Sequence, residues 1–126
     1  MPYNRKFENY VAILLGRMPE SCEQRGICGM QMVVEADGSV YPCDFYVMDR
    51  YRLGNFNTDR VDHIDAKRRE IAFVEESGKV SEVCRSCGYY RVCRGGCQRS
   101  KLFYPEEKGY RSYFCEGYRM FFRECL

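Results

Sequence analysis

The sequence has no long hydrophobic run: its longest uninterrupted apolar stretch covers residues 11–15, far short of the roughly 20 residues that cross a bilayer. The N-terminal region also lacks the pattern of a secretory signal, in which a basic region leads into an apolar stretch and a small-residue cleavage site. We therefore expect a cytoplasmic chain without membrane contact. In a reducing compartment, clustered cysteines generally bind metal rather than form disulfides.

The chain also lacks an excess of charge of one sign. It has 20 basic and 18 acidic residues, which give a net charge of +2. This balance argues against a nucleic-acid partner. The basic residues do concentrate locally, since no acid interrupts the stretch between Val83 and Phe103 that contains Arg85, Arg91, Arg94, Arg99 and Lys101. A nucleic-acid patch is one interpretation. We favour another, in which these cations surround negatively charged metal–thiolate groups.

The apolar patterning predicts a single small α+β domain in 126 residues. Helical spacing of apolar residues predicts helices over residues 7–15, 62–76 and 113–124. Two strands, 30–34 and 40–41, flank an Asp-Gly turn, which is a strong signal for a β-hairpin. We expect residues 1–18 to form a helical lead-in and residues 19–126 an irregular cysteine-rich core.

Cysteine is the residue type in clear excess, with nine in the chain. They are Cys22, Cys28, Cys43, Cys84, Cys87, Cys93, Cys97, Cys115 and Cys125. An odd number leaves one thiol unpaired in any disulfide scheme. Two four-thiolate zinc sites or two iron–sulfur clusters would each use eight cysteines. Histidine contributes little, because His63 is the only one and its polar neighbours predict a surface position.

The two glycines between Cys93 and Cys97 weakly favour iron–sulfur clusters over zinc. Gly95 and Gly96 separate Cys93 from Cys97, and glycine leaves room for a bulky cluster and lets backbone N–H groups approach sulfur. Local composition therefore indicates a thiolate metal site and leaves the identity of the metal open.

The ordered spacing of seven cysteines resembles the SPASM domain, the auxiliary-cluster module of radical S-adenosylmethionine (SAM) enzymes that modify peptides and proteins. The pattern is Cys28-x9-Gly38-x4-Cys43, a gap, and then Cys84-x2-Cys87-x5-Cys93-x3-Cys97-x17-Cys115. Residues 37–46, residues 53–55, the Cys-Arg-Gly-Gly-Cys motif and the segment around Cys115 are most similar to anaerobic sulfatase-maturating enzymes. The resemblance covers nearly the whole chain.

This resemblance implies two 4Fe–4S clusters with four cysteine ligands each. By position, the first would be held by Cys22, Cys28, Cys43 and Cys97, and the second by Cys84, Cys87, Cys93 and Cys115. Cys125 lies outside the pattern and is expected to be a helix-face or tail thiol. The aspartate that follows the hairpin cysteine is the family's candidate base, which implies a catalytic role for Asp44. In a fragment, zinc or empty sites are alternatives.

The implied function is to accept or relay an electron and to dock substrate while a sulfatase cysteine or serine is oxidised to Cα-formylglycine. The radical-generating CxxxCxxC motif does not occur in the sequence. We therefore expect a domain that does not catalyse this reaction alone and that works beside the radical SAM barrel of a full-length chain. S-adenosylmethionine and a third 4Fe–4S cluster would belong to that chain, a sulfatase polypeptide would be its substrate, and the domain is expected to be a monomer.

Two other functions remain open at this point. The domain could serve a maturase of ribosomal peptides, which uses the same radical chemistry on another substrate. It could also be a structural zinc module that binds protein partners.

Overall fold

The computed structural model describes residues 2–126, and the chain in it divides into two compact units. Unit 1 contains the residues up to Cys28 together with Ser77–Leu126, and unit 2 contains Gly29–Glu76. Short helices and two small sheets confirm the predicted α+β class. Across the described part of the chain, we find no helix with the length and apolar character needed to span a membrane. A single functional domain over residues 1–126 stays a prediction.

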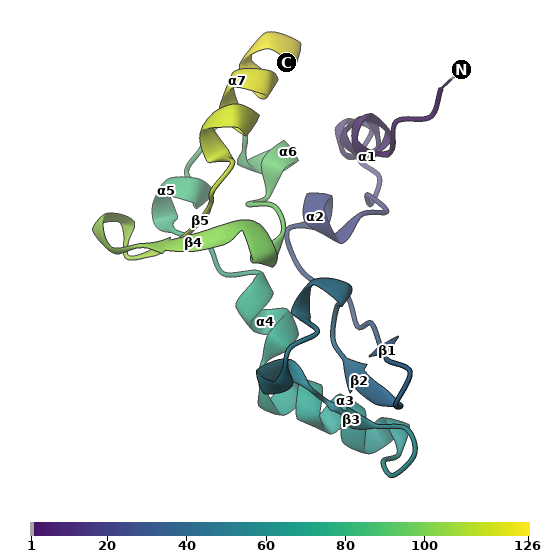
Figure 1. The fold of residues 1–126 in the computed structure, drawn as a ribbon. Coiled ribbons are helices and arrows are strands. Elements are labelled where there is room, and N and C mark those ends of the chain that lie inside the picture. Colours follow the sequence, from purple (N-terminus) through teal and green to yellow (C-terminus); the bar gives the residue numbers. More distant parts are fainter. Residues whose placement is uncertain (1) are drawn as a thin grey trace. The chain divides into compact units, whose positions relative to one another are not determined.

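Unit 2 is built on a three-stranded antiparallel sheet with the order β1-β2-β3 (Figure 1). The strands are β1 (Val33–Val34), β2 (Ser39–Tyr41) and β3 (Gly54–Asn55). Gly38 adopts a positive φ of 86° in the β1–β2 turn, and the Asp37 carboxylate accepts the backbone N–H of Ser39 at 2.9 Å. The predicted hairpin is confirmed, whereas β3 was not predicted.

Helices α3 (Val61–Glu70) and α4 (Phe73–Ser77) replace the single predicted helix over 62–76. The helix is interrupted at Ala72, whose φ of 52° is left-handed. Ile64 of α3 packs with Val40 and Leu53 in the core of unit 2. The short 3₁₀ helices η1 (Asp44–Tyr46) and η2 (Asp49–Tyr51) follow β2 and complete this unit.

Unit 1 is mainly helical. Its helices are α1 (Arg5–Leu14), α2 (Cys22–Arg25), α5 (Glu82–Arg85), α6 (Tyr90–Cys93) and α7 (Cys115–Cys125). Helices α1 and α7 confirm the predictions for 7–15 and 113–124. They contact each other through aromatic rings, with 5.8 Å between the ring centroids of Phe7 and Phe121 and 5.2 Å between those of Tyr10 and Phe122.

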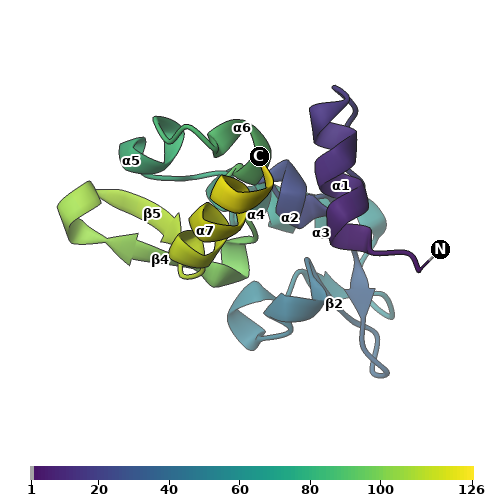
Figure 2. The same ribbon diagram turned by 90° about the horizontal axis from the view of Figure 1, so that it is seen from above.

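A second hairpin in unit 1 was not predicted. It consists of β4 (Lys101–Tyr104) and β5 (Gly109–Ser112), preceded by η3 (Gln98–Ser100) and joined by η4 (Pro105–Glu107). Gly109 packs so closely on Ser81 that an added Cβ would lie 2.7 Å from the Ser81 Cα. Figures 1 and 2 both place α7 between this hairpin and α1.

Candidate metal centre

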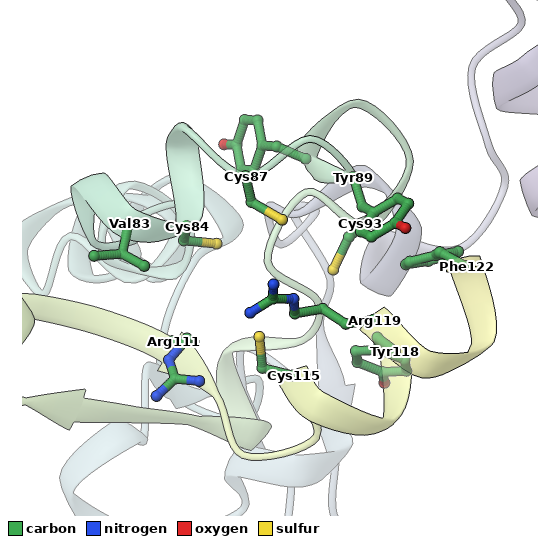
Figure 3. Close-up of a pocket in the computed structure, with 11 residues that line it drawn as sticks. Val83, Cys84, Cys87, Tyr89, Cys93, Arg111, Cys115, Tyr118, Arg119 and Phe122 are labelled. Carbon is green, nitrogen blue, oxygen red and sulfur yellow. The ribbon is translucent and has the colours of Figure 1, made fainter. Parts of the chain in front are cut away.

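Four cysteine side chains meet at one cavity of about 60 Å³ in unit 1. They are Cys84, Cys87, Cys93 and Cys115, and they come from α5, the turn after it, α6 and the start of α7. Their sulfur atoms point toward a common space (Figure 3). The structure thus brings together the four cysteines that the sequence resemblance assigns to the second cluster. We call them group 2.

Local backbone structure explains why the group 2 thiols converge. The Ser81 hydroxyl caps α5 by accepting the N–H of Cys84 at 3.2 Å, and the N–H of Cys87 turns back to the Cys84 carbonyl at 3.2 Å. This tight turn presents both thiols on one side. Cys115 occupies the first turn of α7, where the positive end of the helix dipole favours a thiolate.

Positive charge accompanies group 2. Arg111 of β5 and Arg119 of α7 line the same cavity, and the Arg119 side chain extends among the cysteine sulfurs while Arg111 lies at the edge (Figure 3). The Arg111 guanidinium is held by Glu107, 2.9 Å from its Nε, and by the face of the Tyr104 ring. A hydrogen bond to the Cys115 sulfur raises the pKa of Arg111 above its ordinary value. The site therefore supplies cations where thiolate charge accumulates.

These two arginines were missed by the sequence reasoning. Arg119 follows Cys115 by four residues, so helical spacing alone could have placed both side chains on one face. No comparable signal exists for Arg111, because its position depends on the unpredicted hairpin. In contrast, Arg85, Arg91 and Arg99 from the basic stretch are exposed.

Three further cysteines of unit 1, Cys22, Cys28 and Cys97, line a second, small cavity together with Ser77 and Gln98. We call these three cysteines group 1. The Ser77 hydroxyl accepts the backbone N–H of Cys28 at 2.8 Å, and the Cys28 thiol lies 3.9 Å from the Gln98 side-chain oxygen. All three belong to the set that the resemblance assigns to the first cluster.

The fourth member of that set, Cys43, belongs to unit 2 and precedes η1. Cys43 is buried, and its thiol donates to the exposed carboxylate of Asp44 at 3.4 Å. Cys125 is exposed at the end of α7, as expected for a thiol outside the pattern. His63 is exposed on α3, which confirms its predicted surface position.

The loops that carry the two groups are joined by a close backbone contact. Gly26 ends α2 with a φ of 73°, and a Cβ placed there would lie 2.2 Å from the Arg94 carbonyl oxygen. Arg94 itself has a left-handed φ of 53°, as do Gly95 and Gly96 at 85° and 73°. These three residues turn the chain from Cys93 in group 2 to Cys97 in group 1.

Burial affects the chemistry of the thiols. Together with the neighbouring Cys93 and Cys115, it raises the pKa of Cys84 to about 11. Burial also raises the pKa of Cys28, Cys93 and Cys97. Since metal binds the thiolate, loading either group must release protons.

The donors present fit an iron–sulfur cluster, because group 2 offers four sulfur ligands, a hydrogen-bond donor to sulfur and two cations around one cavity. Within residues 2–126, no three cysteine, histidine or carboxylate side chains stand close enough to hold one metal ion. In a four-iron cluster each thiolate binds a separate iron, so its ligands stand farther apart than those around a single ion.

Comparison with known proteins gives one family, described as the SPASM iron–sulfur cluster-binding domain, which matches residues 22–88. The cysteine-type anaerobic sulfatase-maturating enzyme of Clostridium perfringens (strain ATCC 13124) is 42% identical over 110 residues, which cover 87% of this chain and 30% of that enzyme. The enzyme of the same name from Clostridium novyi (strain NT) is 36% identical over 120 residues, covering 95% and 32%.

The fold is likewise similar to a solved structure, that of native anSMEcpe with bound AdoMet and Kp18Cys peptide. The TM-score is 0.80 at 40% sequence identity, and the match covers 94% of this chain and 33% of the solved one. The chain therefore spans about a third of the length of the relatives it matches.

Because Gly26 lies so close to the Arg94 backbone, we expect a methyl group added at position 26 to lower the stability of the chain. We expect Gly26→Ala to lower the free energy of unfolding of the metal-free chain by about 2–3 kcal/mol, because the new Cβ meets the Arg94 backbone at a strained φ. Denaturant unfolding measures the change. Gly29→Ala is the matched control, since Gly29 has open space around its Cβ position. Equal effects of the two substitutions would contradict the proposed contact.

The raised thiol pKa values predict how stability depends on pH. A thiol whose pKa rises on folding from 9.0 to about 11 stabilises the fold fully below pH 9 and loses that contribution as the pH rises through 11. We expect the reduced, metal-free chain to lose roughly 1 kcal/mol of stability from Cys84 over this range, a figure reduced for solvent screening. Unfolding at several pH values should show a smaller loss in Cys84→Ser. An identical loss would contradict this assignment.

Proposed function

Because the chain belongs to the SPASM family of iron–sulfur cluster-binding domains, we propose that eight of its cysteines hold two 4Fe–4S clusters. Group 2 would hold one, and group 1 together with Cys43 would hold the other. The observation that carries the proposal is the convergence of four thiols from α5, the turn after it, α6 and α7 on one cavity lined by arginines. The family match confirms the resemblance stated from the sequence.

A four-iron cluster supplies one-electron transfer with little structural rearrangement. The residues of this chain bind it and set its environment. The group 2 thiolates provide four negative charges, and Arg111 and Arg119 lie beside them to offset part of that charge. A hydrogen bond from Arg111 to the Cys115 sulfur would also withdraw electron density from a ligand. These contacts suit a site that accepts or relays electrons.

We further propose that the domain works in an enzyme that also contains a radical SAM domain and that oxidises a sulfatase cysteine to Cα-formylglycine. Support comes from two relatives, both named as cysteine-type anaerobic sulfatase-maturating enzymes, at 42% and 36% identity. Further support comes from the similarity in fold to anSMEcpe, whose solved structure contains AdoMet and a peptide. S-adenosylmethionine and a third cluster would bind outside the present chain.

In this proposal Asp44 is the base that takes the proton of the substrate thiol. Its carboxylate is exposed, so a docked peptide can reach it. It lies at the start of η1, next to Cys43, whose thiol donates to it in the metal-free chain. When Cys43 is a thiolate ligand it has no proton to donate, which leaves both carboxylate oxygens available to accept one.

Iron content tests the cluster proposal. After anaerobic reconstitution we expect about eight irons per chain and a brown protein that absorbs in the visible. Cys115→Ala should lower the iron content to about four, because it removes one group 2 ligand. Cys125→Ala is the matched control and should retain all of the iron, since Cys125 is exposed outside both groups. A colourless chain with two zinc ions would contradict the proposal.

Asp44 is tested in an enzyme that joins this domain to its radical SAM domain. Asp44→Asn should lower kcat for formylglycine formation by roughly 10²–10⁴-fold, the usual range for loss of a general base. Iron content should not change. Asp49→Asn removes another exposed carboxylate, at the start of η2, and serves as the control. Activity that is reduced equally in both variants, or in neither, would exclude Asp44 as the base.

A further inference from the structure

Lys101, at the end of the basic stretch 85–101, contacts residues beside group 1 and in the turn between the two groups. It is the first residue of β4, four positions after Cys97, and its side chain is partly buried. Its ammonium donates to the backbone carbonyl of Ser77 at 2.6 Å. Because a carbonyl is neutral, this contact orients the ammonium without neutralising its charge.

Ser77 connects Lys101 to group 1. Ser77 is 1% exposed, and its hydroxyl accepts the backbone N–H of Cys28 at 2.8 Å. The same residue therefore holds the Cys28 backbone with its side chain and the Lys101 ammonium with its carbonyl. This arrangement fixes the cation beside the small cavity that Cys22, Cys28 and Cys97 line.

Gly95 connects Lys101 to the turn between the two groups. A Cβ on Gly95 would lie 3.4 Å from the Lys101 Cε and 3.6 Å from its Nζ. Gly95 is two residues after Cys93 of group 2 and two before Cys97 of group 1. The lysine side chain thus lies against the segment where the chain passes from one group to the other.

The electrostatics agree with this placement. Burial lowers the pKa of Lys101, while Cys84 and Cys93 of group 2 and Cys28 and Cys97 of group 1 all oppose that change. Lys101 in turn acts to lower the thiol pKa of Cys28, Cys84 and Cys97. One cation is therefore within electrostatic range of both groups.

We propose that the Lys101 ammonium, held in place by Ser77 and Gly95, raises the reduction potentials of both clusters. The inference rests on the proposed function, since it requires both clusters to be present. Reduction adds a negative charge to a cluster, and a nearby cation in a partly buried site stabilises the reduced form. A single charge near both clusters keeps both potentials raised together.

The test is a potentiometric titration of the reconstituted chain, followed by electron paramagnetic resonance, in wild type and Lys101→Met. We expect the equilibrium constant for reducing each cluster to fall about tenfold in the variant, which corresponds to ~59 mV for one electron. Lys101→Arg retains the charge and should restore both potentials most of the way. Lys108→Met removes an exposed lysine from the same hairpin and should leave both potentials unchanged.

Iron content separates failure of this inference from failure of the proposed function. A wild-type chain that does not bind about eight irons would contradict the proposed function. Full iron content in Lys101→Met with unchanged potentials, or a change at one cluster alone, would overturn the shared role. If Lys101→Met binds less iron, Lys101→Gln is titrated in its place, because it retains a donor for the Ser77 carbonyl and lacks the charge.

Discussion

The cost of forming thiolates at buried, closely spaced cysteines is the constraint on which unit 1 depends. Seven of its cysteines lie in two groups, and burial keeps several of their thiol pKa values raised in the metal-free chain. The helices that carry them are short, and helices of four residues such as α2, α5 and α6 are not stable by themselves. Metal binding would offset the cost of forming the thiolates through ligand bonds and so contribute directly to folding.

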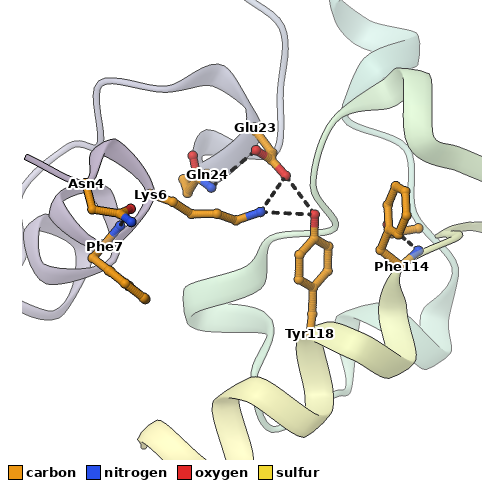
Figure 4. Close-up of polar contacts among 8 residues, drawn as sticks. Asn4, Lys6, Phe7, Glu23, Gln24, Phe114 and Tyr118 are labelled. Carbon is orange, nitrogen blue, oxygen red and sulfur yellow. Dashed lines mark hydrogen bonds and ion pairs between the residues drawn. The ribbon is translucent and has the colours of Figure 1, made fainter.

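Several surrounding residues place positive charge beside these thiols. Arg111 of β5 and Arg119 of α7 line the group 2 cavity, and Cys115 lies at the positive end of a helix dipole. A polar network ties the outer helices to this region: the Tyr118 hydroxyl donates to Glu23 at 2.7 Å, and Lys6 lies 3.3 Å from the same carboxylate (Figure 4). It joins α1 and α7 to α2, the helix that begins at Cys22.

Sequence reasoning was most reliable where chemistry or periodicity is local. The cysteine spacing carried the family resemblance, which implied two ligand sets, and apolar periodicity located α1 and α7. The β4–β5 hairpin was missed because its strands show no alternation: Leu102 and Phe103 are adjacent and both about half exposed. Without this hairpin, the sequence could not predict that Arg111 lines the group 2 cavity. Lys101 was indistinguishable in sequence from Arg85 or Arg91, because only the tertiary contacts with Ser77 and Gly95 separate it from its exposed neighbours.

The most direct test of the account is an anomalous diffraction measurement at the iron edge on anaerobically grown crystals of the reconstituted chain. Two separate iron peaks are expected, one among Cys84, Cys87, Cys93 and Cys115 and one beside Cys22, Cys28 and Cys97. Anomalous signal that appears only at the zinc edge, or a single iron site, would contradict the central claim that two cysteine groups each hold an iron–sulfur cluster.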